Sequence, residues 1–413
     1  MAPGQEQKSL KEYTAQVTSP LVKGEVKLNI GENAFILKGT FDVAEIPYAI
    51  VNSLVYVNYN VIVKTDEGDF TLSRMGNWAQ PFFDALCEVY NKAVLRSFFV
   101  SGDPIFSASG EYRFSEGGVA VDSKSPVRVY ENCVVALPSN GNARRIPLCF
   151  VSGIEKAEYA LTLKLNMGEQ YTFSRLGYDT SRFAEMIEDR MRALLEKSVA
   201  AVKEIDPSLS VSQASQIARL VPEGAAVPIG QLAAIAPSFV SAVEEKMSKT
   251  RAAESYNAFK RMCDPAQIWI GFKKNDARPE EKSVSAEQPE EEEAEPDPYL
   301  FWMIVPSPDK QYAAVEFAVQ PGESAATFVY RTGGDFLRSA AHLNRALEAI
   351  SFKREVIRLS DEELLKPENV DYFMAAKRTA SLQYIRKNFA GRVIHASQES
   401  WERKLTEMWN SSQ

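Results

Sequence analysis

A seven-residue phrase is repeated in this sequence, and each copy contains an arginine. This arginine is the polar residue whose position best suits a binding or catalytic role. The phrase FTLSRMG at Phe70–Gly76 returns as YTFSRLG at Tyr171–Gly177, and ATFVYRTG at Ala326–Gly333 is a looser copy. A guanidinium where a strand ends and a helix begins could clamp a phosphate or a carboxylate. It could also satisfy carbonyls at the strand end and lay its aliphatic stem on the core, a role that a duplicated fold would repeat. The three arginines are Arg74, Arg175 and Arg331.

Residues that commonly perform catalysis are few and scattered. The only histidines, His342 and His395, fall on different predicted elements, with no serine or cysteine nucleophile motif nearby. We expect His342 to have a packing role within a helix. No Walker loop, dinucleotide-binding glycine motif, HExxH motif or EF-hand loop occurs. The sequence therefore predicts a protein that is not an enzyme and has no catalytic residue, metal or cofactor.

The cysteines and the apolar segments point to a cytoplasmic protein. No CxxC pair occurs, so we expect buried free thiols in a reducing compartment. The N-terminus has no apolar segment of signal-peptide length. The uncharged segment 224–243 contains Pro228 and Pro237 and few large apolar residues, which is unsuitable for a membrane span. The cysteines are Cys87, Cys133, Cys149 and Cys263.

The formal net charge of −8 comes from one segment. Between Asp276 and Asp297 there are ten acidic and two basic residues, so the rest of the chain is neutral on balance. This polar, proline-containing run predicts a disordered acidic loop over 276–298, for which a basic partner is an open alternative. A neutral fold without a basic stripe predicts no binding of nucleic acid.

The two close copies of the phrase stay in register upstream, which predicts a duplicated unit of about seventy residues. Ile46-Pro47 corresponds to Ile146-Pro147, and residues 59–64 correspond to 159–164. Alternating apolar residues predict strands, and glycine-containing turns at 66–68 and 166–168 predict hairpins. After the last glycine of each phrase the apolar period becomes 3.6, which predicts one helix with one buried face. The stripe residues include Phe82, Leu86 and Val94 in one copy and Phe183, Ile187 and Met191 in the other.

This order of strands, glycine and a single C-terminal helix resembles the pleckstrin-homology-like (PH-like) superfold, including bacterial PH-like and GRAM-type domains. The resemblance implies a strongly bent antiparallel sheet that one amphipathic helix closes at one end. The resemblance covers about residues 25–97 and 124–200 and, more weakly, 265–352, and it places PH-like modules at 25–98 and 124–204. The chain as a whole is similar to bacterial multi-PH-like proteins. We therefore expect an α+β fold of tandem PH-like modules.

The remaining segments complete the expected domain organisation. Residues 1–24 precede the first module, 99–123 supply strands that connect the two modules, and 205–264 form a helical insertion. A degenerate third PH-like module is expected at 265–352, with the acidic loop inside it. Residues 353–413 are expected to form a helical tail that packs on this third module.

The expected function is that of a cytoplasmic, non-enzymatic adaptor or scaffold that binds protein or peptide partners through PH-like modules. Lipid-binding PH domains carry a basic cluster on the first hairpin, whereas the first copy has only scattered lysines and the second has Arg144 and Arg145 after a turn. The alternative is a peripheral membrane adaptor that recognises anionic lipid headgroups or another phosphorylated ligand. The candidate anion-binding residues are Arg74, Arg175, Arg331, Arg144 and Arg145.

Overall fold

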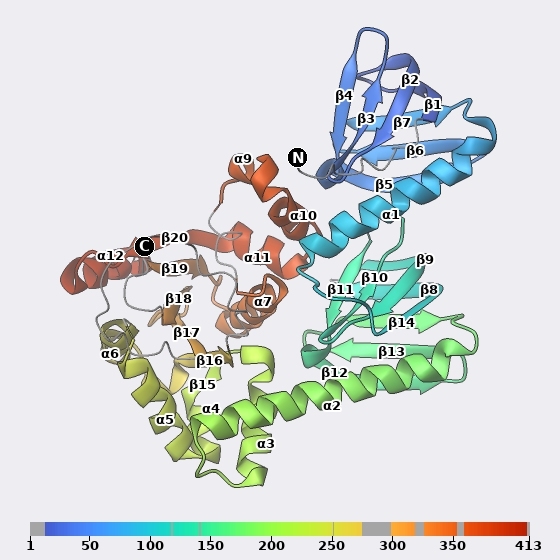
Figure 1. Ribbon diagram of the computed structural model, residues 1–413. Coiled ribbons are helices and arrows are strands. Elements are labelled where there is room, and N and C mark those ends of the chain that lie inside the picture. Colours follow the sequence, from blue (N-terminus) through green and yellow to red (C-terminus); the bar gives the residue numbers. More distant parts are fainter. Residues whose placement is uncertain are drawn as a thin grey trace, which may run out of the picture. The chain divides into compact units, whose positions relative to one another are not determined.

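The strands of this chain form three antiparallel sheets, and the chain divides into two compact units (Figure 1). The computed structural model describes residues 13–116, 119–139, 142–250, 252–274, 299–318, 326–352 and 359–410. The first unit is Met1–Ile187 with Arg358–Ala380, and the second is Glu188–Ile357 with Ser381–Gln413. The predicted acidic loop at 276–298 lies outside the described residues.

The first sheet has the strand order β4-β3-β2-β1-β7-β6-β5 and is followed by one helix, α1. We call this sheet with its helix module 1. Its apolar side chains alternate along the strands, and α1 packs its apolar stripe into the same hydrophobic cluster. Its elements are β1 (Tyr13–Thr18), β2 (Lys23–Ile30), β3 (Ala34–Lys38), β4 (Val43–Pro47), β5 (Val51–Val57), β6 (Asn60–Thr65), β7 (Gly68–Ser73) and α1 (Ala79–Ser97).

The second sheet repeats this order strand for strand, as β11-β10-β9-β8-β14-β13-β12, and is followed by α2. We call it module 2; α2 begins in the first unit and continues into the second. The expected α+β fold of tandem sheet-and-helix modules is thereby confirmed. The elements are β8 (Phe106–Glu116), β9 (Val119–Val129), β10 (Cys133–Ala136), β11 (Arg144–Pro147), β12 (Val151–Ala157), β13 (Ala160–Leu165), β14 (Gln170–Ser174) and α2 (Asp179–Ile205).

Both modules begin earlier than the sequence repeat indicated. Strand β1 lies within the predicted N-terminal segment 1–24, yet it pairs with β2 and β7. Strand β8 and the start of β9, predicted as connecting strands over 99–123, are the corresponding first strands of module 2. The sequence repeat did not extend to them because β1 and the part of β8 that corresponds to it have no identical residue, although the buried Val17 and Tyr112 occupy equivalent positions. Their place is decided by backbone pairing with β7 and β14, each more than fifty residues away.

The helix stripes match the predicted period. In α1 the residues Phe82, Leu86, Tyr90 and Val94 are buried. Burial of each such side chain contributes about 1.5–3 kcal/mol, so the helix is held mainly by the sheet beneath it.

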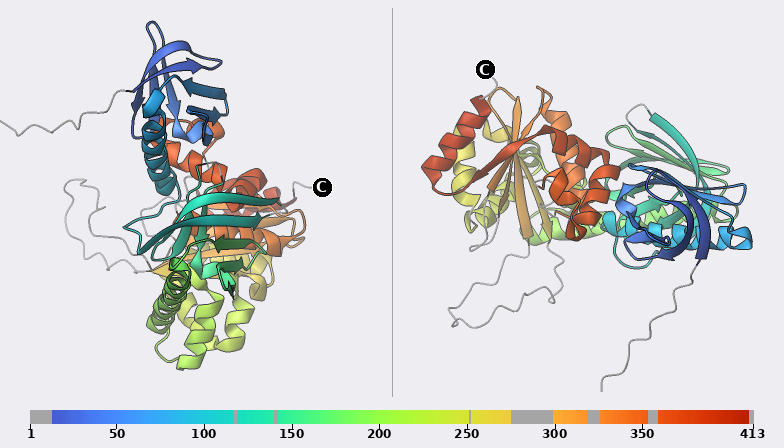
Figure 2. Two further views of the ribbon diagram at one scale, coloured as in Figure 1. Left: turned by 90° about the vertical axis from the view of Figure 1, so that its right-hand side faces the viewer. Right: turned by 90° about the horizontal axis from the view of Figure 1, so that it is seen from above.

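The third sheet, in the second unit, does not repeat the seven-strand order of the modules. Strands β17 and β18 are buried along nearly their whole length, and helices lie on both faces of the sheet (Figure 2). The predicted degenerate PH-like module at 265–352 is therefore a differently built domain. Its elements are β15 (Val227–Pro228), β16 (Trp269–Lys274), β17 (Tyr299–Pro306), β18 (Tyr312–Ala318), β19 (Ala326–Arg331), β20 (Phe389–Ile394) and α7 (Phe336–Ala349).

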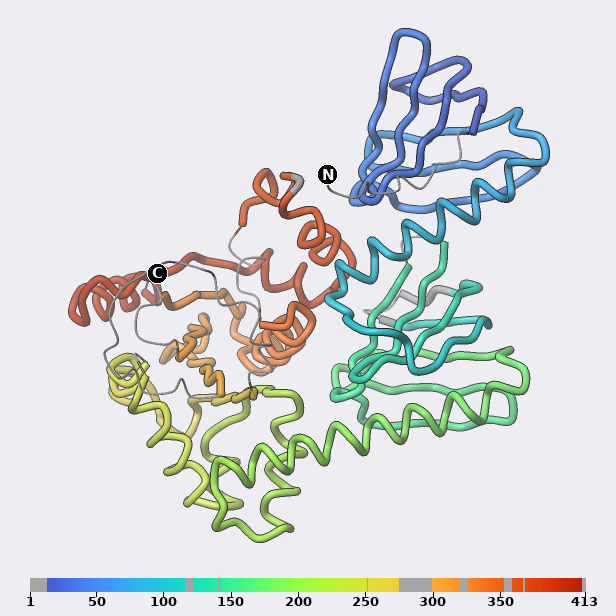
Figure 3. The backbone as a smooth tube through the Cα atoms, in the orientation of Figure 1, coloured from blue at the N-terminus to red at the C-terminus, as the bar shows by residue number. Residues whose placement is uncertain are grey.

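The insertion and the tail are mostly helical, as expected, but both also contribute a strand to the third sheet. Strand β15 comes from the insertion and β20 from the tail. The chain returns to the first unit as α9 and α10 and then leaves it again (Figure 3). Every helix among the described residues is too short or too polar to cross a membrane. The helices are α3 (Val211–Leu220), α4 (Ile229–Ile235), α5 (Pro237–Ser248), α6 (Ala252–Met262), α9 (Asp361–Leu364), α10 (Val370–Arg378), α11 (Ala380–Asn388) and α12 (Gln398–Asn410).

Candidate functional site

The repeated arginines Arg74 and Arg175 occupy the same place in modules 1 and 2, directly after β7 and β14. Both have positive φ angles, 59° for Arg74 and 56° for Arg175. Gly76 and Gly177, two residues further on, also have positive φ angles. Residues other than glycine rarely adopt this left-handed conformation. The repeated phrase therefore encodes one strand-to-helix turn with two left-handed positions.

The two arginine side chains are exposed, but their surroundings differ. The Arg175 guanidinium forms an ion pair with Glu111 of β8, with 2.8 Å between Nη1 and Oε1. We observe no ion pair or side-chain hydrogen bond for Arg74 within the described part of the chain. Of these two arginines, Arg74 is the one exposed without a counter-ion among the residues that the structure describes.

Arg331 does not share the geometry of the other two. It is the last residue of β19 in the second unit, and the left-handed residues that follow it are Gly333 and Gly334. Its own φ is not positive. The strand, arginine and glycine pattern therefore overstated the equivalence of the third copy.

Arg144 and Arg145 lie on β11, an outer strand of the second sheet. The Arg144 guanidinium carbon is 4.4 Å from the ring centroid of Phe114, within the range of a cation–π interaction. Both arginines are half-buried. The described lining of the cavity beside Arg175 includes neither of them.

A cavity of about 520 Å³ lies beside Arg175 within the first unit. Residues from α1, β8, β9 and the turn after β10 line it. Its charged groups are Glu111, Lys124 and Arg175, and Glu111 is already paired with Arg175. The volume is suitable for a small ligand, but the carboxylate of Glu111 lies beside both cations, since it pairs with Arg175 and is opposite Lys124 in the sheet. The neutral lining residues include Cys87, Asn91, Gly110, Leu137 and Ser139.

Cys87 faces this cavity, and its thiol should nevertheless react slowly. Burial raises the pKa of Cys87 to about 12, and the nearby Asp84 carboxylate adds to the shift. Because the thiolate is the reactive form, we expect alkylation by iodoacetamide at pH 8 to be at least about 100-fold slower in the folded than in the unfolded protein. Peptide mass spectrometry over a time course measures this ratio. Equal rates in the folded and urea-unfolded protein would contradict the expectation.

Exposed aromatic residues flank the repeated arginines at one end of each module. Tyr59 lies in the turn between β5 and β6, and Tyr159 lies in the corresponding turn between β12 and β13. In module 2, Ala160 pairs with Ser174, which places Tyr159 beside Arg175. We call these groups the aromatic corners. Corner 1 consists of Tyr59, Arg74 and Trp78, and corner 2 consists of Tyr159, Arg175 and Tyr178, with all four aromatic side chains exposed.

The two histidines each have a packing partner in the second unit. His342 stacks on Tyr384 with 3.9 Å between ring centroids. His395 Nε2 lies 3.0 Å from Glu316 Oε1, and its ring stacks on Trp401. Glu316 also accepts a hydrogen bond from the hydroxyl of a buried threonine, Thr327. Within the described residues, no group of three or more His, Cys, Asp or Glu side chains could hold a metal ion.

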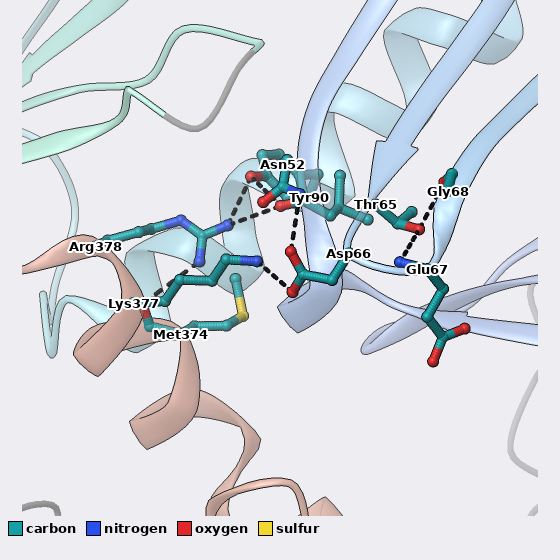
Figure 4. A network of polar contacts seen from close by, with 10 residues as sticks. Asn52, Thr65, Asp66, Glu67, Gly68, Tyr90, Met374, Lys377 and Arg378 are labelled. Atoms are coloured by element: carbon teal, nitrogen blue, oxygen red, sulfur yellow. Dashed lines mark hydrogen bonds and ion pairs between the residues drawn. The ribbon is translucent and has the colours of Figure 1, made fainter. Parts of the chain in front are cut away.

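Module 1 holds helix α10, which arrives from almost three hundred residues further along the chain (Figure 4). Lys377 Nζ donates to Asp66 at 2.7 Å. The Arg378 guanidinium donates to the Tyr90 hydroxyl at 2.7 Å and to the Val51 carbonyl at 3.4 Å. Polar side chains of α10 thus form hydrogen bonds to the start of β5, the β6–β7 turn and α1 of module 1.

Apolar contacts and a further ion pair support this attachment. Met374 is 1% exposed and belongs to the hydrophobic cluster of module 1. Arg96 Nε of α1 lies 3.5 Å from Asp371 Oδ2 of α10. The tail was expected to pack on the third sheet, but α10 packs on module 1 instead. The sequence indicated an amphipathic helix here but not the surface on which it packs, because the residues that contact α10 are remote in the chain.

The α10 contact should weaken in acid. Burial alone would raise the pKa of Asp66, but hydrogen bonds from Lys377 and Asn52 outweigh it and hold this pKa below its ordinary value. A carboxylate with a lowered folded-state pKa stabilises the fold above its unfolded pKa, and this contribution is lost as the pH falls through the folded value. We expect the melting-temperature difference between wild type and Asp66→Asn to shrink as the pH falls from about 6 to about 3. A difference independent of pH would contradict this.

Module 1 also receives a hairpin of module 2, in an arrangement that we call the hairpin contact. The Leu54 backbone nitrogen of β5 donates to the Ser139 carbonyl at 2.7 Å. Leu137 and Ala143, on either side of the β10–β11 turn, are buried in the same hydrophobic cluster as Leu54. Because β5 is the last strand of its sheet, the hairpin covers an edge that would otherwise be open.

Comparisons with known proteins identify no family for this chain. No protein family model and no curated protein matches it. A solved structure entitled "Structure of the Spt16D Pob3N heterodimer" is similar over 38% of this chain and 83% of that chain, with 13% sequence identity and a TM-score of 0.17. The fold assignment therefore rests on the strand order of the two modules.

Proposed function

We propose that this chain is a cytoplasmic, non-enzymatic adaptor or scaffold whose PH-like modules bind segments of protein partners. The observation that carries the proposal is that module 1 already binds two segments from outside itself on separate surfaces. One is a helix, held by Lys377 and Arg378, and the other is a hairpin, held at the β5 edge. Binding of a helix in a groove and of a chain at a sheet edge are both common modes of peptide recognition.

The aromatic corners supply uncovered surface of the kind that protein partners use. Tyrosine, tryptophan and arginine are the residue types that contribute most to binding energy at protein interfaces. Corner 1 combines all three types, and corner 2 combines one arginine with two tyrosines. Tyrosine and tryptophan have few rotatable bonds, so little side-chain entropy is lost when they bind. The left-handed conformation of Arg74 and Arg175 costs about 1–2 kcal/mol each, and such strain is often kept where a site needs it.

The proposal is tested by cross-linking the full chain in its source cells and identifying captured proteins. We expect one or more reproducible partners whose yield falls at least about 10-fold in a Tyr59→Ala, Trp78→Ala double variant, since interface hot spots contribute about 2 kcal/mol or more. Leu337→Ala, which removes an equally exposed apolar residue from α7, is the matched control. Identical capture by all three proteins, or no reproducible partner, would refute the corner-based scaffold.

A second candidate function is that of a peripheral membrane adaptor, which the exposed and uncompensated Arg74 favours. A guanidinium beside the start of a helix is suited to a phosphate group. Flotation with vesicles of phosphatidylcholine alone and with added phosphatidylserine or phosphoinositide separates the two functions. A membrane adaptor floats only with the anionic vesicles and loses this behaviour in Arg74→Ala, whereas a protein scaffold remains at the bottom in both.

A further inference from the structure

The hairpin contact has two parts, a hairpin and the strand edge on which it docks. The chain contains a second hairpin and a second edge of these kinds, and the two are not joined to each other. Because the strand orders of the two sheets are identical, the β10–β11 hairpin of module 2 corresponds to the β3–β4 hairpin of module 1. In the same way, edge strand β5 corresponds to β12. The registers agree, since Leu54 pairs with Val63 and Ile154 pairs with Leu163. Module 1 thus has a second hairpin of the docking type, and module 2 has a second edge of the receiving type.

The correspondence can be made residue by residue. The carbonyls of Asn33 and Asn132 accept equivalent hydrogen bonds from the backbone nitrogens of Tyr48 and Leu148. Counting onward from these two asparagines, Thr40 takes the place of the residue whose carbonyl accepts from Leu54 in the hairpin contact. The β3–β4 connection is one residue shorter, with residues 38–43 between the paired Leu37 and Ala44 and residues 137–143 between the paired Ala136 and Arg144. Thr40 is therefore the counterpart of Ser139 when counted from the β3 side, at the tip of a tighter turn.

Burial shows that the second hairpin and the second edge are both uncovered. Ala143 is 1% exposed in the hairpin contact, whereas its counterpart Val43 is 70% exposed. Phe41, at the tip of the β3–β4 hairpin, is 94% exposed. Leu54 is 2% exposed, whereas its counterpart Ile154 is only half-buried. Two neighbouring exposed apolar side chains and an unpaired strand edge both promote association.

We propose that a second copy of this chain covers these surfaces, by docking its β3–β4 hairpin on the β12 edge of the first copy. The Ile154 nitrogen of one copy then donates to the Thr40 carbonyl of the other, as Leu54 does to Ser139 within one chain. Val43 and Phe41 then pack against Ile154 of β12. The occupant is a second copy because this chain supplies both parts and already joins the same two parts within itself.

This arrangement is head-to-tail, so each copy can bind a further copy, unlike the subunits of a symmetric dimer. Each copy has one free hairpin and one free edge, and addition of copies does not close unless the rotation between them forms a ring. Lys38 stands where the docked hairpin has the buried Leu137, so the contact between copies is less apolar than the one within the chain. We therefore expect association that is reversible and depends on protein concentration.

The test is sedimentation velocity of the full-length protein over about 1–100 µM, a range suited to modest interfaces. The wild type should show a mean mass that rises with concentration beyond that of a dimer. A hairpin variant, Phe41→Asp with Val43→Asp, and an edge variant, Ile154→Asp, should each remain monomeric. Both hairpin residues are largely exposed, so that variant should fold normally, which circular dichroism can verify. Leu337→Asp, at an exposed apolar position outside both surfaces, is the control and should associate like the wild type.

An equimolar mixture of the two variants gives the sharpest result. The hairpin variant keeps an intact edge and the edge variant keeps an intact hairpin, so the mixture should form dimers and nothing larger. A wild type that stays monomeric throughout the range would overturn the proposal. So would a hairpin variant that still associates, or a monomeric wild type whose Phe41 hairpin binds phosphatidylserine vesicles instead.

Discussion

Replacement of Gly271 by alanine should lower the free energy of unfolding of the second unit by about 3–5 kcal/mol. Gly271 lies on β16, and a Cβ atom there would overlap the indole of Trp302 and the carbonyl of Gly224. These two groups are joined by a buried hydrogen bond of 2.8 Å from Trp302 Nε1. The methyl group would therefore force the ring aside and leave both polar groups unsatisfied. Urea denaturation followed by tryptophan fluorescence measures the loss.

Gly153→Ala is the matched control for this prediction. Gly153 also lies within a strand, β12, but the nearest atom to a Cβ there is Lys164 Cβ at 4.0 Å, an ordinary contact distance. We expect its unfolding free energy to change by no more than about 0.5 kcal/mol. The same small effect for both substitutions would show that Trp302 does not pack closely on Gly271.

Arg378→Ala should detach α10 from module 1, with a local loss of about 2–4 kcal/mol. The side chain is 6% exposed, and its guanidinium donates to the Tyr90 hydroxyl and to the Val51 carbonyl. Removal leaves these two buried acceptors without their charged donor. Hydrogen exchange of the α10 amides should become faster by about 30-fold or more, because exchange reports the free energy of local opening.

The control for this prediction is Lys387→Ala, which removes an exposed basic residue from the last turn of α11. Exchange in α10 should be unchanged in this variant. Arg378→Lys should restore only part of the protection, since an ammonium group lacks the planar fork that reaches two acceptors at once. Full protection of α10 in Arg378→Ala would show that the apolar contacts alone hold the helix.

The sequence by itself determined the local units of this protein. The repeated phrase, the hairpin turns and the helix stripes are all visible because strand and helix periods are written in neighbouring residues. The same phrase located Arg74 and Arg175 correctly at equivalent turns. The left-handed backbone conformation of these arginines is seen only in the structure, since arginine is not a residue type that indicates a positive φ.

Only the tertiary structure decided which distant segments join. Strand β1 has no residue identical to its counterpart in β8, yet both take the same place in their sheets. Helix α10 contacts module 1, and β20 completes a sheet that begins more than a hundred residues earlier. Arg331 looked like a third repeat because strand, arginine and glycine are short local patterns that unrelated domains share. Alternating side chains mark a segment as a strand but do not identify the strand with which it pairs, because each hydrogen bond depends on where the rest of the chain has placed the partner.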